Sequence, residues 1–323
     1  MRYLGRRLLQ SFCLLVGVSL LSFAFVELAP GNFFDEMRLN PRISNEAISG
    51  LRKQYGIDQP LPVRYARWLG SVAKGEFGFS FAYNAPVGSL LWPRARNTLL
   101  LTGSATLLTW IIALPLGILS AGARHGWIDR STLLLTSVLL STPDLLLSLG
   151  LLLFAVRTRL LPAGGMISLA AENQGGWQQA ESLAIHMLGP VTVLVLISLP
   201  TLVRHTRAAM IEALDSPYVR AARSHGISPG RILLRHAFPV ALNPLISLFG
   251  LSVGSLLSAS LLTEVVVSWP GLGPLLLEAI LGRDTYVVIG AVVFASVLLV
   301  CGTLLSDVLL FASDPRIRSE RLA

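Results

Sequence analysis

Polar residues that could do chemistry are scarce in this sequence, and they concentrate in one short stretch. Residues 216–239, SPYVRAARSHGISPGRILLRHAFP, carry four arginines and two histidines between two apolar runs. The only lysines are Lys53 and Lys74, and no G-x-x-x-x-G-K-[ST] phosphate-binding loop occurs. No H-E-x-x-H or similar ligand spacing joins the five histidines, at positions 125, 186, 205, 225 and 236. We therefore expect no catalytic residues, no metal site, no cofactor and no ATP hydrolysis by this chain.

The polar stretch, residues 216–239, predicts two helices that meet at a sharp corner. Each begins with a Ser-Pro pair, at 216–217 and at 228–229, since a serine hydroxyl caps a first turn and proline suits the first helical position. Gly226 is placed to end the first helix in a left-handed turn. The pattern predicts a short helix over 217–225 and a second helix that starts at residue 229.

Side chains of the first of these helices suit contact with another protein. Ala221 and Ala222 are adjacent small residues that would let a partner's backbone come close. Arg220, Arg223 and His225 would supply hydrogen-bond donors around them. The alternative is a plain connecting loop whose arginines only follow the charge bias of membrane proteins.

The composition places the elements that carry this corner in a lipid bilayer. Hydrophobic residues make up 53% of the chain and charged residues 14%, and the mean hydropathy is +0.66, outside the balance of a soluble domain. A helix needs ~20 apolar residues to cross the hydrocarbon core. Six runs meet this length: 8–26, 97–123, 131–156, 182–203, 236–263 and 285–306. Because a crossing segment must satisfy its own backbone hydrogen bonds, we predict an all-α integral membrane protein with six transmembrane helices.

Charges in the loops predict the orientation of these helices. With the N-terminus inside, the inner segments hold 14 Arg or Lys and the two short outer loops hold three. The segment 27–96 holds nine more, but its 70 residues exceed the ~60-residue limit for loops that steer topology. Both termini are therefore expected in the cytoplasm, and the formal charge of +8 needs no nucleic-acid partner. The inner segments are 1–7, 124–130, 204–235 and 307–323, and the outer loops are 157–181 and 264–284.

The segment before the second run carries helix signals of its own. Residues 44–55 and 62–72 space apolar side chains along one face, which predicts short helices against the outer membrane surface. The first run ends without a clear small-x-small cleavage site, which favours a retained signal anchor over a cleaved signal peptide. Cys13 and Cys301 both fall within runs and are interpreted as small apolar residues.

Asp144, after Pro143, is the only charged residue inside the run 131–156. A carboxylate facing lipid is costly, so in one interpretation both residues lie on a pore or against another helix. In the other, the span begins nearer Leu139 and Asp144 lies close to the cytoplasmic headgroups. The sequence leaves both open.

Several stretches resemble, in order, motifs of the permease subunits of bacterial ABC importers. Ala221-Ala222, then Gly226, then Pro239 thirteen residues later reproduce most of the spacing of the EAA loop of that family. Others resemble its dipeptide, oligopeptide and nickel branch, and together they cover nearly the whole chain: YGIDQPLPVRYARWL at 55–69, GEFGFSF at 75–81, RNTLLLT at 96–102, LPAGG at 161–165 and TEVVVSWPGLGPLLLEAILGRDTY at 263–286.

The sequence also departs from the pattern of that family. Arg220 stands where the name-giving Glu would be, and His236 and Phe238 replace the usual Ile and Leu. Asn32 follows Pro30-Gly31 where an Asp is common. Loss of the Glu removes one polar anchor from the expected contact with an ATPase.

The resemblance implies a type I ABC importer permease fold in a bacterial inner membrane. It implies an N-terminal helix with an external segment over 1–93, a transmembrane type-1 domain over 94–311 and a cytoplasmic tail over 312–323. The polar corner becomes the coupling loop that fits a cleft of an ATPase subunit. Its implied residues are Ser216, Pro217, Arg220, Ala221, Ala222, Arg223, Gly226 and Pro239.

The same resemblance implies the partners and the function. Two ATP-binding subunits, a second homologous permease chain and an external substrate-binding protein would assemble with this chain in the bilayer. The binding protein would dock on the external segment and on the loop that carries Glu264, Trp269, Pro270, Gly271 and Gly273. The chain would form half of a translocation pore for peptides or a related small solute, whose identity the sequence does not give.

Two other classes of function are open to a chain of this composition. A secondary transporter without an ATPase normally needs coupling-ion carboxylates deep in several spans and often shows inverted repeats, whereas this chain has one such carboxylate and no internal repeat. An intramembrane enzyme would need a paired Ser/His, Asp/Asp or metal-ligand set, which the sequence lacks. The permease interpretation is therefore preferred, and the chain is not expected to be an enzyme.

Overall fold

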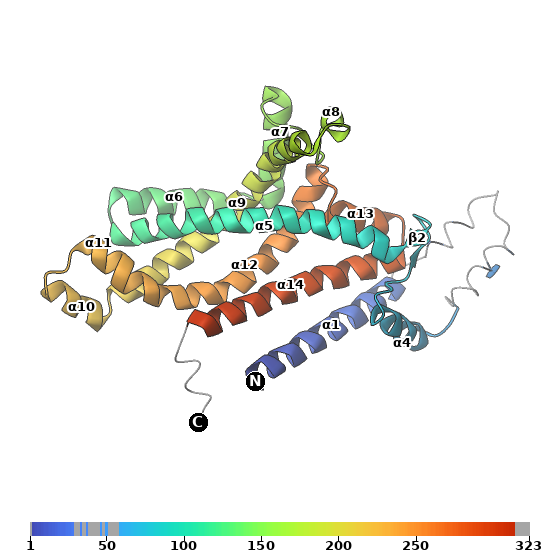
Figure 1. The fold of residues 1–323 in the computed structure, drawn as a ribbon, viewed down its shortest axis with the longest axis horizontal. Coiled ribbons are helices and arrows are strands. Elements are labelled where there is room, and N and C mark those ends of the chain that lie inside the picture. Colours follow the sequence, from blue (N-terminus) through green and yellow to red (C-terminus); the bar gives the residue numbers. More distant parts are fainter. Residues whose placement is uncertain are drawn as a thin grey trace. The chain divides into compact units, whose positions relative to one another are not determined.

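A computed structural model describes residues 2–28, 33, 37, 46, 49–50 and 58–313 of the chain. Most of the predicted helix over 44–55 and most of the predicted tail over 312–323 lie outside these residues. The described elements follow one another along the chain as coloured in Figure 1. They are α1 (Arg2–Leu28), α4 (Leu61–Val72), β1 (Phe79–Ser80), β2 (Ala85–Pro86), α5 (Val87–Gly122), α6 (Trp127–Ser141), α7 (Asp144–Thr158), α8 (Leu169–Glu172), α9 (Gly176–Leu214), α10 (Pro217–Ser224), α11 (Pro229–Arg231), the π-helix η1 (Ile232–Ala237), α12 (Phe238–Val266), α13 (Leu272–Leu281) and α14 (Thr285–Ser313).

Five of the predicted spans are confirmed as long apolar helices within the described residues. They cover Gly5–Leu28, Val87–Gly122, Gly176–Leu214, Pro229–Val266 and Thr285–Ala312. Each has at least 24 residues, which exceeds the ~20 that cross the hydrocarbon core. These helices extend past the charge-free runs, because helical geometry continues through flanking polar residues that lie in the headgroup region.

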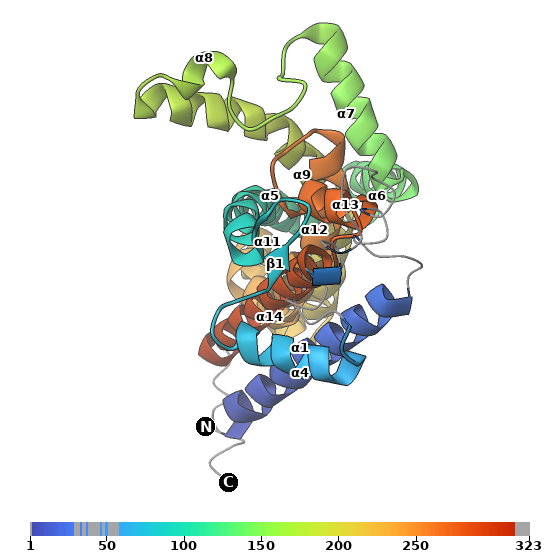
Figure 2. The ribbon, with the colours of Figure 1, turned by 90° about the vertical axis from the view of Figure 1, so that its right-hand side faces the viewer.

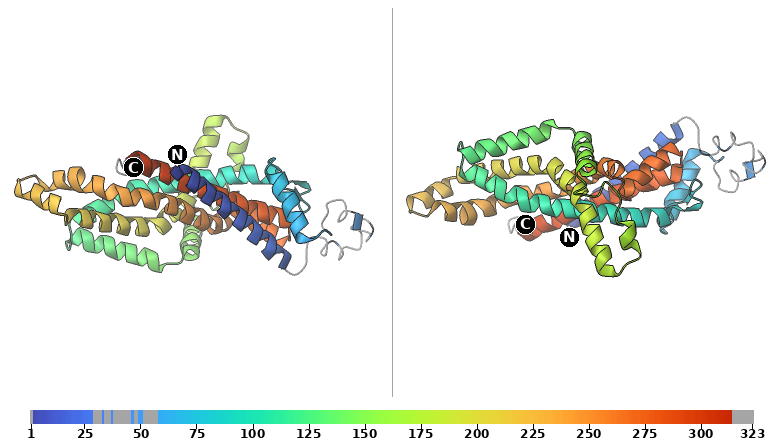
Figure 3. Two further views of the ribbon diagram at one scale, coloured as in Figure 1. Left: turned by 90° about the horizontal axis from the view of Figure 1, so that it is seen from below. Right: turned by 90° about the horizontal axis from the view of Figure 1, so that it is seen from above.

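The remaining run, 131–156, is not one helix as predicted. α6 and α7 are separate helices bent by 95° at Thr142-Pro143, so the count reaches six only if this pair is a single span. Figure 3 shows the bend in green. Thr142 and Pro143 both have extended backbone, as a residue before proline prefers, and this ends α6.

The chain divides into two compact units, one of residues 1–98 and 270–300 and the other of residues 99–269 and 301–323. In the first unit α4 packs across α1, as Figure 2 shows. Its core joins Phe23 of α1, Trp68 of α4 and two residues of α14, Ile289 and Val293. The predicted helix over 62–72 is thus confirmed, and its aromatic side chains hold it against the first span.

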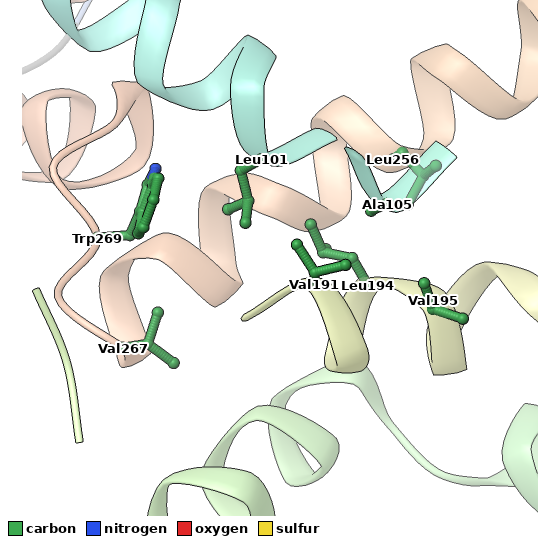
Figure 4. Packing of buried hydrophobic residues seen from close by; sticks show 8 residues of the cluster. All are labelled: Leu101, Ala105, Val191, Leu194, Val195, Leu256, Val267 and Trp269. Carbon is green, nitrogen blue, oxygen red and sulfur yellow. The ribbon is translucent and has the colours of Figure 1, made fainter. Parts of the chain in front are cut away.

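The second unit is built around contacts of α9 with α6, α7 and α12. The side chains in Figure 4 form a buried cluster of this unit, drawn from α5, α9, α12 and the turn after α12. Small residues let the helices approach: a Cβ built on Gly302 of α14 would lie 2.6 Å from Val253 of α12, and one on Gly117 of α5 would lie 2.6 Å from Thr206 of α9. Such close contacts are typical of helix packing in membranes.

Candidate functional site

The α10 corner, residues 216–231, has the geometry that the sequence predicts. α9 ends at Leu214, α10 follows over Pro217–Ser224, and Gly226 has a φ of +73°, the left-handed turn expected of it. α11 then leads through η1 into α12. Figure 1 shows this corner at one end of α9 and α12.

The capping predicted for the two serines of this corner is wrong. The Ser216 side chain donates to the carbonyl oxygen of Ala213 at 2.6 Å and makes no cap hydrogen bond to α10. Ser228 also lacks a side-chain cap bond to α11. The proline at the first helical position of each helix remains as the start signal, because its ring fixes the helical φ and its missing N–H would have no intrahelical partner there.

The outward face of the α10 corner is basic. Val219 is fully buried and anchors α10, while Arg220, Ala221 and Arg223 are exposed and Ala222 is half-buried. Four exposed arginines make no ion pair with any described residue: Arg220, Arg223, Arg231 and Arg235. This surface therefore suits a partner that presents carboxylates.

The segment between the α10 corner and α12 contains a widened helical turn. η1 is a π-helix that ends just before Phe238 and Pro239 in the first turn of α12. Pro239 has no N–H to donate to the carbonyl of Arg235, and its ring crowds that carbonyl, which explains the widening. The Tyr218 hydroxyl donates to the carbonyl oxygen of His236 at 3.2 Å and ties α10 to this turn.

A buried ion pair beside the corner was missed from the sequence. Arg207 of α9 donates to both carboxylate oxygens of Asp129 on α6, from Nε at 2.6 Å and from Nη2 at 2.8 Å. The Ser120 hydroxyl and the His125 backbone N–H also donate to Asp129, at 2.6 and 2.9 Å. Asp129 is 2% exposed. The signal was available, because a carboxylate at the edge of a span normally requires a partner.

The sequence left two interpretations of Asp144 open, and the structure places Pro143 and Asp144 at the start of α7 rather than in the middle of one continuous helix. Pro143 is the N-cap of α7 and Asp144 is its first residue, exposed at the bend. A carboxylate at a helix N-terminus is stabilised by the helix dipole and by free backbone N–H groups. This gives Asp144 a favourable environment without a second charged residue.

A cavity of about 210 Å³, with a mainly apolar lining that includes several hydroxyl groups, lies among α5, α9 and α12 of the second unit. Thr109 and Ser198 share a hydrogen bond of 2.8 Å in its wall, and the Trp110 indole donates to Ser252 at 3.4 Å. Thr201 and His205 of α9 are exposed and also line it. The sequence analysis missed this set because isolated hydroxyls in a span usually bond only to the backbone of their own helix.

The loop 264–273 buries most of the residues proposed to face a binding protein. Glu264 and Trp269 are fully buried in the second unit, where the Trp269 N–H donates to the carbonyl oxygen of Glu264 at 2.9 Å. Gly271 and Gly273 are buried in the first unit, and only Pro270 is half-buried. In this structure these residues shape the loop, since buried side chains cannot meet a partner.

Two residues of the motif RNTLLLT hold the first-unit part of that loop. The Asn97 side-chain amide donates to the carbonyl oxygen of Pro270 at 2.8 Å. The Leu272 N–H donates to the Thr98 hydroxyl at 2.9 Å. The motifs at 96–102 and 263–286 thus meet through hydrogen bonds, although they are far apart in sequence.

A second set of motif contacts forms what we name the β clamp, residues 78–86 and 284–286 of the first unit. Asp284, 1% exposed, accepts hydrogen bonds from the Ser80 hydroxyl at 2.6 Å and from the Ala82 N–H at 3.2 Å. Gly78, with a φ of +104°, leaves room for the ring of Tyr286, 3.0 Å from where a Cβ would lie. These contacts fix the β1–β2 hairpin against the start of α14.

Tyr83 joins the β clamp to α13. Its phenol donates a hydrogen bond to the Glu278 carboxylate. Burial first, and then this hydrogen bond and the charge of Glu278, raise the pKa of Tyr83 to about 12. The phenol therefore stays protonated well above neutral pH. Among the described residues no group of three or more His, Cys, Asp or Glu could hold a metal ion.

Long apolar helices, an exposed basic corner and a cavity with hydroxyl groups in its wall are consistent with an integral membrane transport component. Residues 113–319 match the model of the binding-protein-dependent transport system inner membrane component, and residues 1–102 match the model of the N-terminal part of such components. The chain belongs to this family. It is a permease subunit of an ATP-binding-cassette importer, a membrane-embedded transport component rather than an enzyme, and the family works with ATPase and substrate-binding partners.

Curated relatives match over their full length. The chain is 34% identical to the oligopeptide transport system permease protein AppB of Bacillus subtilis (strain 168), with 98% of each chain covered. It is 31% identical to the dipeptide transport system permease protein DppB of Escherichia coli (strain K12), with 99% of this chain and 100% of that protein covered. A solved structure of the MetNI methionine ABC transporter in an inward-facing conformation matches with a TM-score of 0.57 and 20% identity, over 70% of this chain and 96% of that chain. That likeness supports the fold alone.

Proposed function

We propose that this chain forms half of the translocation path of a peptide importer, with residues 94–311 as its transport domain. The observation that carries the proposal is the cavity among α5, α9 and α12, which places several hydroxyls and one imidazole among apolar side chains of helices that are apolar enough to cross a bilayer. Hydroxyls and an imidazole can exchange hydrogen bonds with the amide groups of a passing peptide. The printed names of the relatives, which refer to oligopeptides and dipeptides, support this class of solute.

A second, homologous permease chain would supply the other half of the path. Polar residues on the open side of the cavity, Thr201, His205 and Ser255, are exposed in this chain. Exposed polar side chains in a span are unfavourable against lipid, and they are satisfied if they face water or another subunit. In a heterodimer of two permease chains, these side chains would face either the water in the path or the partner subunit.

Two ATP-binding subunits would drive the path by moving the α10 corner. The corner protrudes from α9 and α12, and its exposed arginines have no ion-pair partner within the described chain. An ATPase cleft lined by carboxylates would complement them. Through α9, the Asp129–Arg207 pair would pass the movement to α6 and so to the bend at Pro143.

In the orientation that we propose, both termini and residues 204–243 lie in the cytoplasm and residues 30–96 lie outside. An external binding protein would deliver peptide on the outside, to the segment 30–96 and the accessible parts of the loop 264–284. Asp58→Cys and His225→Cys, each in a background without Cys13 and Cys301, test this orientation with an impermeant thiol reagent. Intact cells should label position 58 only, and labelling of 225 alone would invert the topology.

Reconstitution tests the transport proposal. Vesicles that hold the chain with its partner permease and ATPase should take up labelled di- and oligopeptides only when ATP and a binding protein are present. The double variant Thr201→Val with His205→Leu should lower uptake by about tenfold, the effect of about 1.4 kcal/mol of lost hydrogen bonding. Thr192→Val, on the same helix but away from the cavity, is the matched control.

Two outcomes would contradict this proposal. Uptake that follows an ion gradient without ATP would make the chain a secondary transporter. Normal uptake by the cavity variant would place the path elsewhere.

A comparison of Asp144→Asn with Asp144→Leu tests whether the bend lies on the path. Altered uptake in both variants, with assembly retained, would place Asp144 on the path, and normal uptake in the Leu variant would exclude it.

A further inference from the structure

A second cavity, of about 600 Å³, lies in the first unit between α4 and the residues that follow it. The transport proposal makes no use of it. Its walls come from α4, from the chain over 75–79, from the start of α5 and from the first turn of α14. The lining residues that matter below are Arg64, Arg67, Trp68, Glu76 and Tyr286.

Arg64 gives this cavity a buried cationic wall. Its side chain is 10% exposed, and Nη1 donates to the Glu27 carboxylate at the end of α1, at 2.8 Å. The Nε–H of Arg64 is buried and has no hydrogen-bond partner among the described residues. Buried N–H groups are nearly always paired, and a guanidinium favours two-pronged contacts with phosphate or carboxylate oxygens. Arg64 thus places a mostly buried cationic side chain, paired with Glu27, in the wall of the cavity.

The other charged residues of the lining set what kind of anion fits. Arg67 follows Arg64 by three residues, on the same face of α4, and it forms no ion pair with a described residue. Glu76 adds a carboxylate to the lining, and Trp68 and Tyr286 add aromatic rings, whose faces attract cations. Glu27 already neutralises one arginine. The set fits a zwitterion, with an anionic group at the arginines and an ammonium at Glu76.

The depth of the cavity points to a lipid. Glu27 belongs to the last turn of α1, where the span Gly5–Leu28 leaves the hydrocarbon core. Farther from the end of α1, the Tyr65 hydroxyl of α4 shares a hydrogen bond of 2.9 Å with Ser19, so α4 crosses α1 near the C-terminal end of the span. The guanidinium of Arg64 is thus at headgroup level.

Exposed apolar side chains lie next to the cavity in the same unit. Val63 and Leu69 of α4 are 46% and 36% exposed, and Trp92 of α5 is 68% exposed. Exposed tryptophan is typical of the membrane interface, and an amphipathic helix of this kind lies in the plane of the headgroups. Acyl chains of a bound lipid would cover these side chains, which a soluble zwitterion could not do.

We propose that this cavity binds a phosphoethanolamine headgroup of the membrane leaflet at which α1 ends. The phosphodiester lies on Arg64 and Arg67, and the ammonium lies beside Glu76. A bound lipid of this kind would join α1 to α4. The proposal does not depend on the solute that the chain transports.

Native mass spectrometry of the purified full-length chain tests the proposal with vesicle lipids of three headgroups. Phosphatidylethanolamine should be retained in preference to phosphatidylcholine and phosphatidylglycerol. Arg67→Gln should lower retention of all three by about tenfold, because each loses a charge-assisted hydrogen bond to phosphate. Glu76→Gln should remove only the preference for phosphatidylethanolamine over phosphatidylcholine. Lys74→Gln, which removes a neighbouring charge outside the lining, should behave as the unchanged chain.

Three results would overturn the proposal. Equal retention of the three lipids, unaffected by Arg67→Gln, would show ordinary annular lipid. Displacement of the lipid by millimolar inorganic phosphate or free phosphoethanolamine would assign the cavity to a soluble phosphate. Displacement by a dipeptide would assign it to the transported solute. Arg67 and Glu76 are used because neither holds an ion pair in the fold, so loss of binding in these variants cannot be attributed to unfolding at Glu27.

Discussion

The α10 corner and the β clamp both come from stretches that resemble family motifs, yet their polar side chains have opposite surroundings. Arg220 and Arg223 of the corner are exposed and form no ion pair with a described residue. Ser80 and Asp284 of the clamp are buried and bond to one another. A polar motif residue can thus serve a partner or serve the fold, and burial distinguishes the two. The predictions below test this distinction.

The largest effect on stability is expected from the buried ion pair beside the corner. Asp129→Ala leaves the Arg207 guanidinium without its carboxylate, and breaking one partner of a buried pair costs about 3 kcal/mol or more. The thermal unfolding midpoint of the purified chain should fall. Asp215→Ala is the matched control, because its ion pair with Arg124 is exposed and such pairs contribute at most about 1 kcal/mol. Equal losses in the two variants would refute the distinction between buried and exposed pairs.

A smaller loss of stability is expected in the β clamp. Asp284→Ala removes the acceptor of Ser80 and of the Ala82 N–H and should lower the free energy of unfolding by about 2 kcal/mol. Asp284→Asn keeps one acceptor oxygen and should retain part of the free energy of unfolding that the Ala variant loses. Proteolysis within residues 81–86 should increase in the Ala variant. If cleavage and unfolding are both unchanged, the clamp does not hold the hairpin.

A substitution in the α10 corner should change the coupling of uptake to ATP hydrolysis rather than the stability of the chain. Gly226→Val forces a β-branched residue to a φ of +73°, with roughly 1–3 kcal/mol of local strain that an exposed turn relieves by rearranging. Membrane insertion and unfolding should change little, whereas peptide uptake and its coupling to ATP hydrolysis should fall. Gly230→Val, the same change at a helical glycine with no neighbour within 4 Å of its Cβ position, is the control. Normal coupling in the Gly226 variant would make the corner a mere connector.

The smallest effect concerns the phenol of Tyr83. Its pKa is raised to about 12, so the unfolded chain, with a tyrosine pKa near 10, releases this proton first. The contribution to stability is therefore complete below about pH 10 and is lost as the pH rises from about 10 to about 12. The difference in tyrosinate absorbance between the chain and Tyr83→Phe should show this high pKa. In Glu278→Gln the midpoint should move toward 10, and an unchanged midpoint would leave burial as the sole cause.

Local signals in the sequence were sufficient for the parts of the site that depend on backbone preference. The turn at Gly226 and the helix starts at Pro217 and Pro229 follow from the conformations that glycine and proline favour. The caps at Ser216 and Ser228 failed because a serine hydroxyl can choose among several nearby backbone groups, and Ser216 bonds back to α9. The bend before Pro143 was missed because proline is often accommodated within a transmembrane helix.

The sequence by itself determined the long apolar spans and the corner between α9 and α12, because hydropathy and backbone preference act over a few neighbouring residues. Its motifs, in their order along the chain, indicated the family. The tertiary structure decided which polar residues meet. Asp129 and Arg207 are 78 residues apart, and Ser80 and Asp284 are 204 apart. Such pairs depend on helices brought side by side by the packing of many apolar side chains, a property of the whole fold that no short stretch encodes.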